Sequence, residues 1–343
     1  MLRYEKTSDG TKPVIASGEL TVENTTYCGA HCVMCPRDEY QHEWQHMSME
    51  LFQQVIRQGV ELGMTSLDLC GFGDPLMDPG FENKLAHVKE TYPQVRIYTS
   101  TTANLLTKKR LDPICRSLDT MKISNYGFSK VSYEAIHGGT EKFEKVWENI
   151  HNLLARPHGQ RPHVILSFLV FPENQHEMEA WKAYWQKRAD EIMVWLPHNY
   201  GGSNQIVDRA YSSRARVEGA SPRSCGRPAR GNPYVRFNGD VSVCCFDFNH
   251  RLVVGNLRQT SLLDVLAGEQ LTHVKAVHER LSFEGSGLLC EGCDQIYDRA
   301  DALIYSNNPS RKVDQPVTHP SHVVKLVQID EMYSGPATSI EVR

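Results

Sequence analysis

Short apolar runs alternate with longer amphipathic stretches between about residue 18 and residue 197. The apolar runs, most of them rich in β-branched residues, predict β-strands, whereas the stretches between them have the spacing of helices. The six predicted strands are Glu19–Glu23, Ser66–Leu69, Val95–Thr99, Thr120–Ile123, Val164–Phe171 and Glu191–Leu196. Alternating strands and helices indicate an α/β fold built on a parallel sheet.

Three of the intervening stretches have a clear apolar face. The first begins after Ser48, a residue type that commonly caps helix N-termini. The apolar residues are Leu51, Phe52, Val55 and Ile56 in the first, Phe143, Val146, Ile150, Leu153 and Leu154 in the second, and Trp181 and Trp185 in the third. These spacings predict helices that pack against the core.

The pattern changes near Gly201, where a segment rich in Gly, Ser and Arg runs to Arg230 with little periodicity. Such a segment indicates a junction between domains. Beyond about Asn307, Pro, Ser and charged residues dominate, and only Val323–Ile329 predicts a strand. We therefore divide the chain into an N-terminal extension (1–17), an α/β domain (18–205), a cysteine-rich domain (215–306) and a tail (307–343).

Composition narrows the classes of protein to consider. The 343 residues are 40% hydrophobic and carry a net charge of −4 with Lys and Arg scattered along the chain, so we expect no nucleic-acid partner. The first ten residues lack the apolar region of a secretion signal, and the longest apolar run, Val164–Phe171, is too short to cross a bilayer. We expect a cytoplasmic protein without a membrane partner. Ten clustered cysteines in such a protein suggest metal binding more than disulfides.

Three of these cysteines, Cys28, Cys32 and Cys35, follow the first predicted strand closely. Three thiolates on one loop can hold three irons of a [4Fe-4S] cluster and leave the fourth iron open to another ligand. A zinc site with His31 as fourth ligand is the alternative. The spacing CxxxCxxC resembles the radical S-adenosylmethionine (SAM) superfamily. That resemblance implies a partial (β/α)6 TIM-like barrel and a cluster that cleaves SAM to a 5′-deoxyadenosyl radical.

The resemblance extends to segments at the ends of later strands. Gly71-Phe-Gly73-Asp74 looks like the family's Gly-Gly-Glu motif, with Asp74 in place of the usual Glu. Glycines permit the close approach of a backbone to a ligand. Ser124 matches a serine that many members direct at SAM, and Thr102 and Asn104 resemble a Thr-Asn segment near SAM. As single polar residues at strand ends, the last three could equally cap helices.

A second group of cysteines lies late in the chain. Cys225, Cys244, Cys290 and Cys293, with Gly239 five residues before Cys244, resemble the SPASM and shorter twitch extensions of radical SAM enzymes. The resemblance implies one auxiliary [4Fe-4S] cluster on these four thiols, a site that is fully ligated and suited to electron transfer. A structural four-cysteine zinc site is the alternative.

Three cysteines remain. Cys245 could be a spare ligand, a buried apolar residue or a thiol that returns a hydrogen atom to a substrate radical. Cys70 abuts the glycine turn and is a weaker donor candidate, whereas Cys115 is expected in a helix core.

The family resemblance also bears on the substrate. Compact SPASM/twitch enzymes dehydrogenate, epimerise or decarboxylate sugars, aminocyclitols and nucleosides, and they take electrons from flavodoxin- or ferredoxin-type donors. Polar and aromatic residues follow the sixth predicted strand, and among them His198 is the candidate acid or base. Modification of a peptide or protein side chain is a second hypothesis, and a non-enzymatic protein with two zinc sites is a third.

Overall fold

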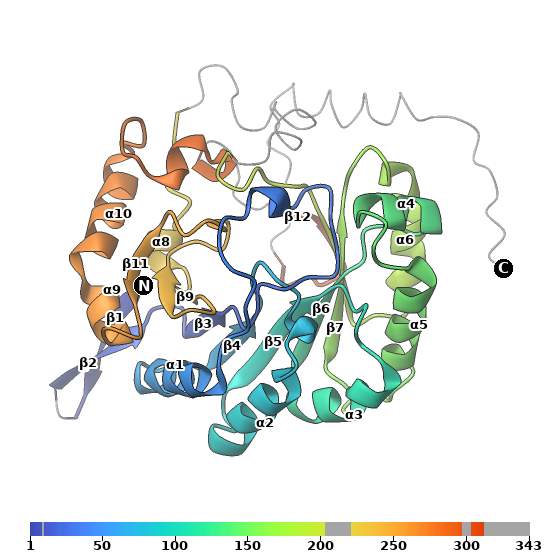
Figure 1. The fold of residues 1–343 in the computed structure, drawn as a ribbon, viewed down its shortest axis with the longest axis horizontal. Helices are drawn as coiled ribbons and strands as arrows, with labels where there is room; N and C mark the ends of the chain where they lie inside the picture. Colours follow the sequence, from blue (N-terminus) through green and yellow to red (C-terminus); the bar gives the residue numbers. More distant parts are fainter. Residues whose placement is uncertain (9, 203–220, 297–302, 312–343) are drawn as a thin grey trace.

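In a computed structural model, residues 1–8, 10–202, 221–296 and 303–311 are described (Figure 1). One sheet of ten strands dominates the molecule, in the order β11-β10-β9-β3-β4-β5-β6-β7-β8-β12. Its six central strands are parallel and comprise β3 (Glu19–Val22), β4 (Ser66–Leu69), β5 (Arg96–Thr101), β6 (Thr120–Ser124), β7 (His163–Leu169) and β8 (Glu191–Trp195). All six predicted strands are thus confirmed.

The ends of β5 and β7 show the largest errors in the predicted boundaries: β5 runs two residues beyond the predicted Thr99, and β7 stops two residues early. Strand β7 was expected to run to Phe171, but it ends at Leu169. The side chain of Asn174 accepts a hydrogen bond from the backbone N–H of Phe171 and donates to the carbonyl of Leu169. A local turn satisfied by an asparagine therefore replaces the last two residues of the strand.

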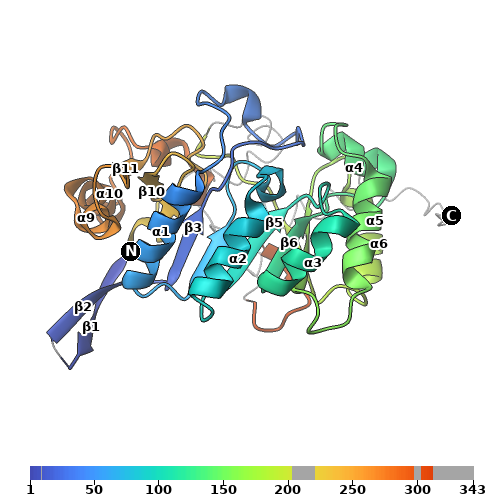
Figure 2. The same cartoon turned by 60° about the horizontal axis from the view of Figure 1, so that its bottom comes forward.

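Helices cover the outer face of this sheet (Figures 1 and 2). They are α1 (Met49–Glu61), α2 (Phe81–Thr91), α3 (Lys108–Ser117), α4 (Lys130–Ile136), α5 (Phe143–Leu154) and α6 (Met178–Trp185). As expected, the hydroxyl of Ser48 accepts a hydrogen bond from Leu51 N at the start of α1. Short 3-10 turns occupy Arg37–Glu39, Pro75–Met77, Gln175–Glu177, Leu289–Gly292 and Asp294–Ile296. Together the helices cover the apolar outer face of the strands.

Side chains alternate between the two faces of each strand, and this alternation separates the core from the barrel interior. In β4, Leu67 and Leu69 are fully buried against the helices, so Asp68 between them points inward. The register places Asp68 beside Tyr98 of β5, and Lys122 of β6 one inward-facing position further along. The interior is consequently polar near the carboxyl ends of the strands.

The cysteine-rich region extends the same sheet. Strand β9 (Tyr234–Val235) pairs in parallel with β3, and β10 (Asp240–Ser242) and β11 (Val253–Asn256) follow in antiparallel order. Helices α8 (Arg227–Arg230), α9 (Leu262–Ala267) and α10 (Glu269–Arg280) accompany them, on the left of Figure 1. The backbone ladder between β3 and β9 thus continues the barrel sheet into the region that holds the later cysteines.

The N-terminal extension forms a hairpin that the sequence pattern did not predict. Strands β1 (Leu2–Thr7) and β2 (Gly10–Ile15) pair with each other in a separate two-stranded sheet. The hairpin is tied down at its base, where Ile15 is fully buried and the amino group of Met1 donates a hydrogen bond to Ala229 of α8. Most positions of the two strands are exposed and polar, so the sequence lacks the alternation of apolar and polar residues that predicts a strand.

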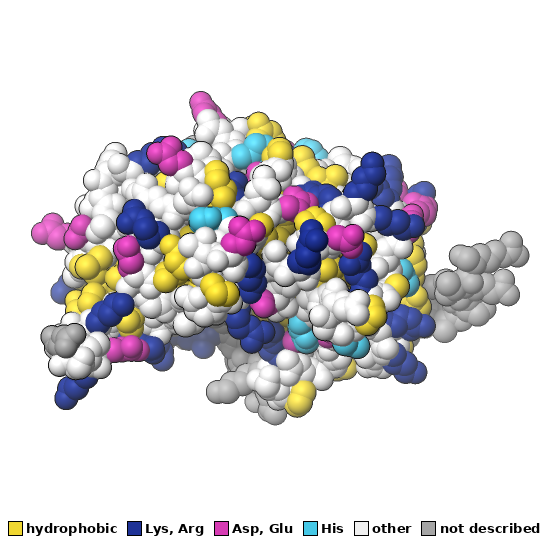
Figure 3. Space-filling view, turned by 90° about the horizontal axis from the view of Figure 1, so that it is seen from below, with side chains coloured by type: hydrophobic (Ala, Val, Ile, Leu, Met, Phe, Trp, Pro, Cys, Tyr) yellow, Lys and Arg dark blue, Asp and Glu magenta, His cyan; other side chains and the backbone are white. Residues whose placement is uncertain are grey.

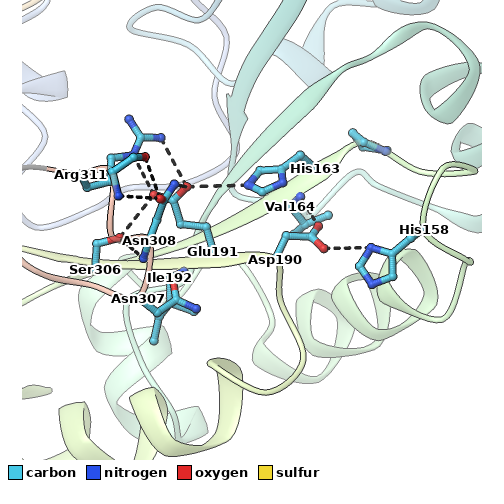
Figure 4. Close-up of polar contacts among 12 residues, drawn as sticks. His158, His163, Val164, Asp190, Glu191, Ile192, Ser306, Asn307, Asn308 and Arg311 are labelled. Carbon is cyan, nitrogen blue, oxygen red and sulfur yellow. Dashed lines mark hydrogen bonds and ion pairs between the residues drawn. The ribbon is translucent and has the colours of Figure 1, made fainter.

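The last described segment, β12 (Leu303–Ser306), pairs antiparallel with β8. It is anchored by the carboxylate of Glu191, only 1% exposed, which accepts hydrogen bonds from Ser306, Asn308 and Arg311 (Figure 4). His163 of β7 lies beside the same carboxylate. The predicted strand Val323–Ile329 lies outside the described residues.

Figure 3 shows basic and acidic side chains interspersed over the face of the molecule seen from below. Within the described ranges, no helix is both long and apolar enough to cross a membrane.

Substitution of Glu191 tests the anchor of β12. We expect Glu191→Gln to lower the free energy of unfolding by about 1.5–3 kcal/mol, because three donors lose their hydrogen bonds to a buried, charged acceptor. The measurement is urea denaturation at neutral pH. The control is Glu179→Gln, because the Glu179 side chain is 73% exposed and pairs with Lys182 at the surface. This substitution should cost less than about 0.5 kcal/mol. Equal effects of the two substitutions would contradict this interpretation.

Candidate functional site

The loop that follows β3 carries the first three cysteines across one end of the barrel (Figures 1 and 2). Cys35 N donates a hydrogen bond to the carbonyl of Cys32, and Arg37 donates to the carbonyl of Ala30. These contacts fold the segment back on itself. The three thiols are close enough that Cys28 and Cys35 each influence the pKa of Cys32.

The surroundings of these thiols are apolar and acidic. Burial raises the pKa of Cys28 to about 12, helped by the nearby carboxylate of Asp74, and burial raises that of Cys35 to about 11. Buried thiols become thiolates readily only when cations neutralise them. Three such thiols on one loop therefore fit a cluster of iron ions better than a free, reactive cysteine.

His137, which sequence reasoning did not single out, lies against this loop. Its Nδ1 is 3.5 Å from the sulfur of Cys32, and its ring stacks between Tyr126 and Tyr133. The residue is fully buried, its Nε2 has no hydrogen-bond partner among the described residues, and burial lowers its pKa to about 3. A separation of 105 residues from Cys32 left no local signal of this contact.

The turn after β4 is pressed against the cysteine loop. A Cβ atom on Gly73 would lie 2.4 Å from the carbonyl oxygen of Thr25, and one on Gly71 would lie 2.4 Å from the side chain of Glu23. Asp74 N donates to the carbonyl of Tyr27. Both glycines are therefore required by close packing against the protein itself. Their approach to SAM, which the motif predicts, stays a prediction.

The carboxylate of Asp74 connects the turn after β4 to the end of β5. It accepts hydrogen bonds from Leu76 N, the hydroxyl of Thr101, and both the backbone N–H and the hydroxyl of Thr102, at 2.8–2.9 Å. It is only 7% exposed. Asp74 therefore acts here as an internal brace for the strand-end loops.

Thr102 and Asn104 flank a strained residue. Ala103 has a φ of +64°, which is uncommon for a residue with a Cβ atom, and Asn149 holds its carbonyl with a 2.9 Å hydrogen bond. Asn104 lies beside the cysteine loop, since its amide nitrogen is 3.8 Å from where a Cβ of Gly29 would be. The predicted segment thus lies next to the first three cysteines.

Thr102 also contacts Glu141, a buried acid whose pKa burial raises to about 7. A hydroxyl carries a single hydrogen, so Thr102 cannot donate to Asp74 and Glu141 at once. A protonated Glu141 resolves the conflict by donating to Thr102. The last predicted residue of this set, Ser124, ends β6 and accepts a hydrogen bond from Tyr126.

A cavity of about 250 Å³ opens at the mouth of the barrel. Lys122, Ser167 and Trp195 contribute from the strands, and His198 contributes from the loop after β8, as predicted. Its remaining lining residues are Met34, Tyr126, Leu169, Leu196, Pro197, Tyr200, Arg227 and Phe246. Polar groups on apolar and aromatic walls suit a small ligand with several hydroxyl or amino groups.

Asp68 is a second residue that sequence reasoning missed. It points into the barrel, its Oδ2 accepts a hydrogen bond from the thiol of Cys70, and its buried Oδ1 has no hydrogen-bond partner in the described part of the chain. Burial raises its pKa to about 7. The signal was available, because an acidic residue between two leucines of a predicted strand must face the barrel interior.

The four later cysteines line one cavity. Cys225, Cys244, Cys290 and Cys293 meet there among mainly apolar side chains, and His278 Nε2 is 3.3 Å from the sulfur of Cys290. The thiols surround this cavity; no group of three or more His, Cys, Asp or Glu side chains within the described ranges is arranged to hold a single metal ion. Four thiols around an apolar cavity fit the donor set of an iron–sulfur cluster.

Cys245 is exposed and lies on the barrel side of its loop, because it influences the pKa of Asp68, Cys70 and Tyr200. It also forms a hydrogen bond with Cys244, the leading cause of that thiol's raised pKa. Cys115 is half-buried in α3 and packs against the core, as expected for a structural residue.

Comparison with known proteins adds independent evidence. The family model of the radical SAM superfamily matches residues 22–183, and that of the SPASM iron–sulfur cluster-binding domain matches residues 225–294. A S-adenosyl-L-methionine-dependent 2-deoxy-scyllo-inosamine dehydrogenase from Niallia circulans is 21% identical over 284 residues, which are 81% of this chain and 92% of the relative.

Solved structures share the fold. BtrN in complex with AdoMet and 2-DOIA gives a TM-score of 0.56 at 18% identity, covering 80% of this chain and 92% of BtrN. SuiB from Streptococcus suis, bound to the precursor peptide SuiA, gives 0.59 at 15% identity, covering 82% and 70%. The radical SAM model covers the region with the first three cysteines, and the SPASM model covers the region with the later four. Both matches agree with the grouping of the cysteines in the structure. The chain belongs to the radical SAM superfamily, as a SPASM-type enzyme whose cofactors are S-adenosylmethionine and [4Fe-4S] clusters.

Proposed function

We propose that this enzyme dehydrogenates a hydroxyl-bearing carbon of a small aminocyclitol or a similar carbohydrate-like molecule. The observation that carries the proposal is the adjacency of two cavities: the barrel-mouth cavity and the cavity lined by four cysteines share part of their lining. A substrate in the first would lie next to an electron acceptor in the second. The Niallia circulans relative, named as a dehydrogenase of an aminocyclitol, supports the same substrate class.

The grouping of the cysteines in the structure supports the following assignment of ligands. Cys28, Cys32 and Cys35 hold the cluster that binds SAM, and Cys225, Cys244, Cys290 and Cys293 hold the auxiliary cluster. Gly71, Gly73, Thr102, Asn104 and Ser124 shape the SAM side of the site, with Asp74 as their brace. When bound, these groups supply a 5′-deoxyadenosyl radical and an acceptor for one electron. A flavodoxin- or ferredoxin-type protein is the source of the electron that starts the reaction.

Net oxidation of an alcohol to a ketone removes two hydrogens from the substrate. SAM, when bound, would supply the radical that takes the carbon-bound hydrogen atom as 5′-deoxyadenosine, and a cluster held by Cys225, Cys244, Cys290 and Cys293 would supply the acceptor for the remaining electron. The hydroxyl proton passes to a side-chain base. His198 and Asp68 are the candidate bases, because one lines the cavity and the other faces the barrel interior with a pKa of about 7. Lys122, whose ammonium lies 5.6 Å from the Trp195 ring centroid, provides a positive charge that can orient polar substrate groups.

The size of the cavity favours a small metabolite over a peptide. About 250 Å³ is near the lower end of the range for sites that enclose small molecules. Epimerisation is the competing outcome on the same substrates, with Cys245 as hydrogen donor, since it lies on the barrel side of its loop. Fold similarity to the peptide-bound SuiB keeps peptide modification as a candidate to be tested beside it.

A direct assay tests the proposed reaction. The anaerobically reconstituted enzyme is incubated with SAM, a reductant and a panel of aminocyclitols, sugars, nucleosides and short peptides. We expect 5′-deoxyadenosine and an aminocyclitol product lighter by two hydrogens. An unchanged mass with inverted stereochemistry that depends on Cys245 would establish epimerisation instead. Oxidation of peptides alone would overturn the small-substrate proposal.

Two variants separate the roles of the cysteine groups. Cys28→Ala should abolish 5′-deoxyadenosine formation, because it removes a ligand of the SAM-binding cluster. Cys244→Ala should leave 5′-deoxyadenosine detectable but reduce the dehydrogenated product by at least about tenfold. Cys245→Ala should retain dehydrogenation. Full dehydrogenation by Cys244→Ala would contradict the assigned auxiliary site.

Gly73 offers a test of the first cluster site. In Gly73→Ala, a Cβ atom would collide with the backbone before Cys28 and displace the cysteine loop. The iron content after reconstitution should fall from about eight per chain towards about four, since the auxiliary site is untouched. The control is Gly80→Ala, where the nearest atom, Asp78 Oδ1, is 3.3 Å away; it should keep about eight.

The raised pKa of Asp68 predicts a pH dependence of stability. The folded protein holds its proton to higher pH than the unfolded chain, so this residue makes stability fall as pH rises from about 4 to 7, by at most about 1.4 kcal/mol per pH unit for one proton. Glu19, Lys122, Cys70 and Cys245 are the charged or titratable groups that act on it.

Urea denaturation between pH 4 and 8 measures this effect. Asp68→Asn should become progressively more stable than the parent protein as the pH rises, with the difference levelling off above about pH 7. Asp112→Asn is the control, because that side chain is 71% exposed. A difference between Asp68→Asn and the parent that does not change with pH would show that the Asp68 carboxyl titrates normally.

A further inference from the structure

Arg227 and Phe246 line both the barrel-mouth cavity and the cysteine cavity, and they are the only described residues that appear in both linings. The guanidinium carbon of Arg227 lies 4.5 Å from the ring centroid of Phe246. The ring of His198 lies 3.6 Å from the same ring. The side chains of Arg227 and Phe246 therefore separate the two cavities, because each of them lines both.

The chain ties both of these residues to candidate cluster ligands. Arg227 follows Cys225 by two residues, and Phe246 follows Cys244 by two. Gly226, with a φ of +79°, turns the chain so that Arg227 can begin α8. On the other side, Phe246 N donates a hydrogen bond to the sulfur of Cys244. The positions of Arg227 and Phe246 are thus determined by the segments that hold the thiols.

Among the described residues that line the cysteine cavity, Arg227 is the only Lys, Arg, Asp or Glu. A fixed positive charge in an apolar cavity favours any added negative charge there.

We infer that Arg227, held on Phe246 at the boundary of the two cavities, raises the reduction potential of the auxiliary cluster and so promotes electron transfer from the substrate side. The electron that leaves the substrate adds one negative charge to the acceptor beside the guanidinium, and the guanidinium stabilises that charge. The role of Arg227 in electron transfer from the substrate rests on the proposed function. Its effect on the potential is independent of any substrate.

The test is a redox titration of the auxiliary cluster. The full chain carries Cys28→Ala, Cys32→Ala and Cys35→Ala, so that the spectroscopic signal comes from the auxiliary cluster alone. In this background we expect Arg227→Gln to shift the midpoint potential to a more negative value, whereas Arg227→Lys, which keeps the charge, stays near the parent. Arg230→Gln is the matched control, an exposed residue on the same helix outside both cavities.

An unchanged midpoint potential in Arg227→Gln would overturn the inference, and so would an equal shift in Arg230→Gln. If the glutamine variant does not retain the cluster, Arg227→Met, which preserves an apolar stem over Phe246, is titrated in its place and must show the same negative shift.

A second measurement separates this inference from the proposed function. In the otherwise intact enzyme, Arg227→Gln should give several-fold less dehydrogenated product per 5′-deoxyadenosine than the parent. A shifted potential with no dehydrogenation by the parent would refute the proposed function alone. Dehydrogenation by the parent with an unshifted potential in Arg227→Gln would refute this inference alone.

Discussion

The geometry of the candidate SAM site depends on the buried carboxylate of Asp74. Its oxygens accept hydrogen bonds from Thr101 and Thr102 at the end of β5, and its own N–H, in the turn after β4, donates to the carbonyl of Tyr27 just before Cys28. Thr102 extends the network to Glu141, which in turn contacts Tyr133 and approaches His137 beside Cys32. These groups are shielded from water. Removal of one partner would therefore leave a buried polar group unsatisfied, which costs more stability than the net contribution of an ordinary hydrogen bond. Loops from distant parts of the sequence are thereby held at one end of the barrel.

Much of this fold was predictable, because its strands and helices follow from the local pattern of apolar and polar residues. The six parallel strands and the helix after Ser48 follow from periodicity and capping, and the cysteine spacings predict their own grouping. His137 and Asp68 show the limit. His137 reaches Cys32 only through the packing of α4, and the sequence around it has no pattern that would announce a contact with the cysteine loop. The sequence could predict that the Asp68 side chain faces the barrel interior. It could not predict the raised pKa of Asp68, which depends on neighbours from other strands.

The hairpin β1–β2 and the sheet extension β9–β11 were missed for a different reason. Both consist of short or largely polar strands, in which pairing along the backbone matters more than side-chain burial. Backbone hydrogen bonding leaves little trace in composition. The pairing of β9 with β3 nevertheless joins the cysteine-rich region to the barrel sheet, so the sequence was least informative about how its two cysteine regions are connected.

The apolar cluster around β12 bears on how molecules reach the site. Leu303 packs with Ile165 and Met193, and Ile165 lies one inward-facing position below Ser167 of the barrel-mouth cavity. Leu303, Ile165 and Met193 thus fill part of the barrel interior next to the cavity with hydrocarbon. We expect SAM, the substrate and their products to enter and leave through the end where the cysteine loop lies. Binding of one of these molecules there would then govern the order in which the others bind and dissociate.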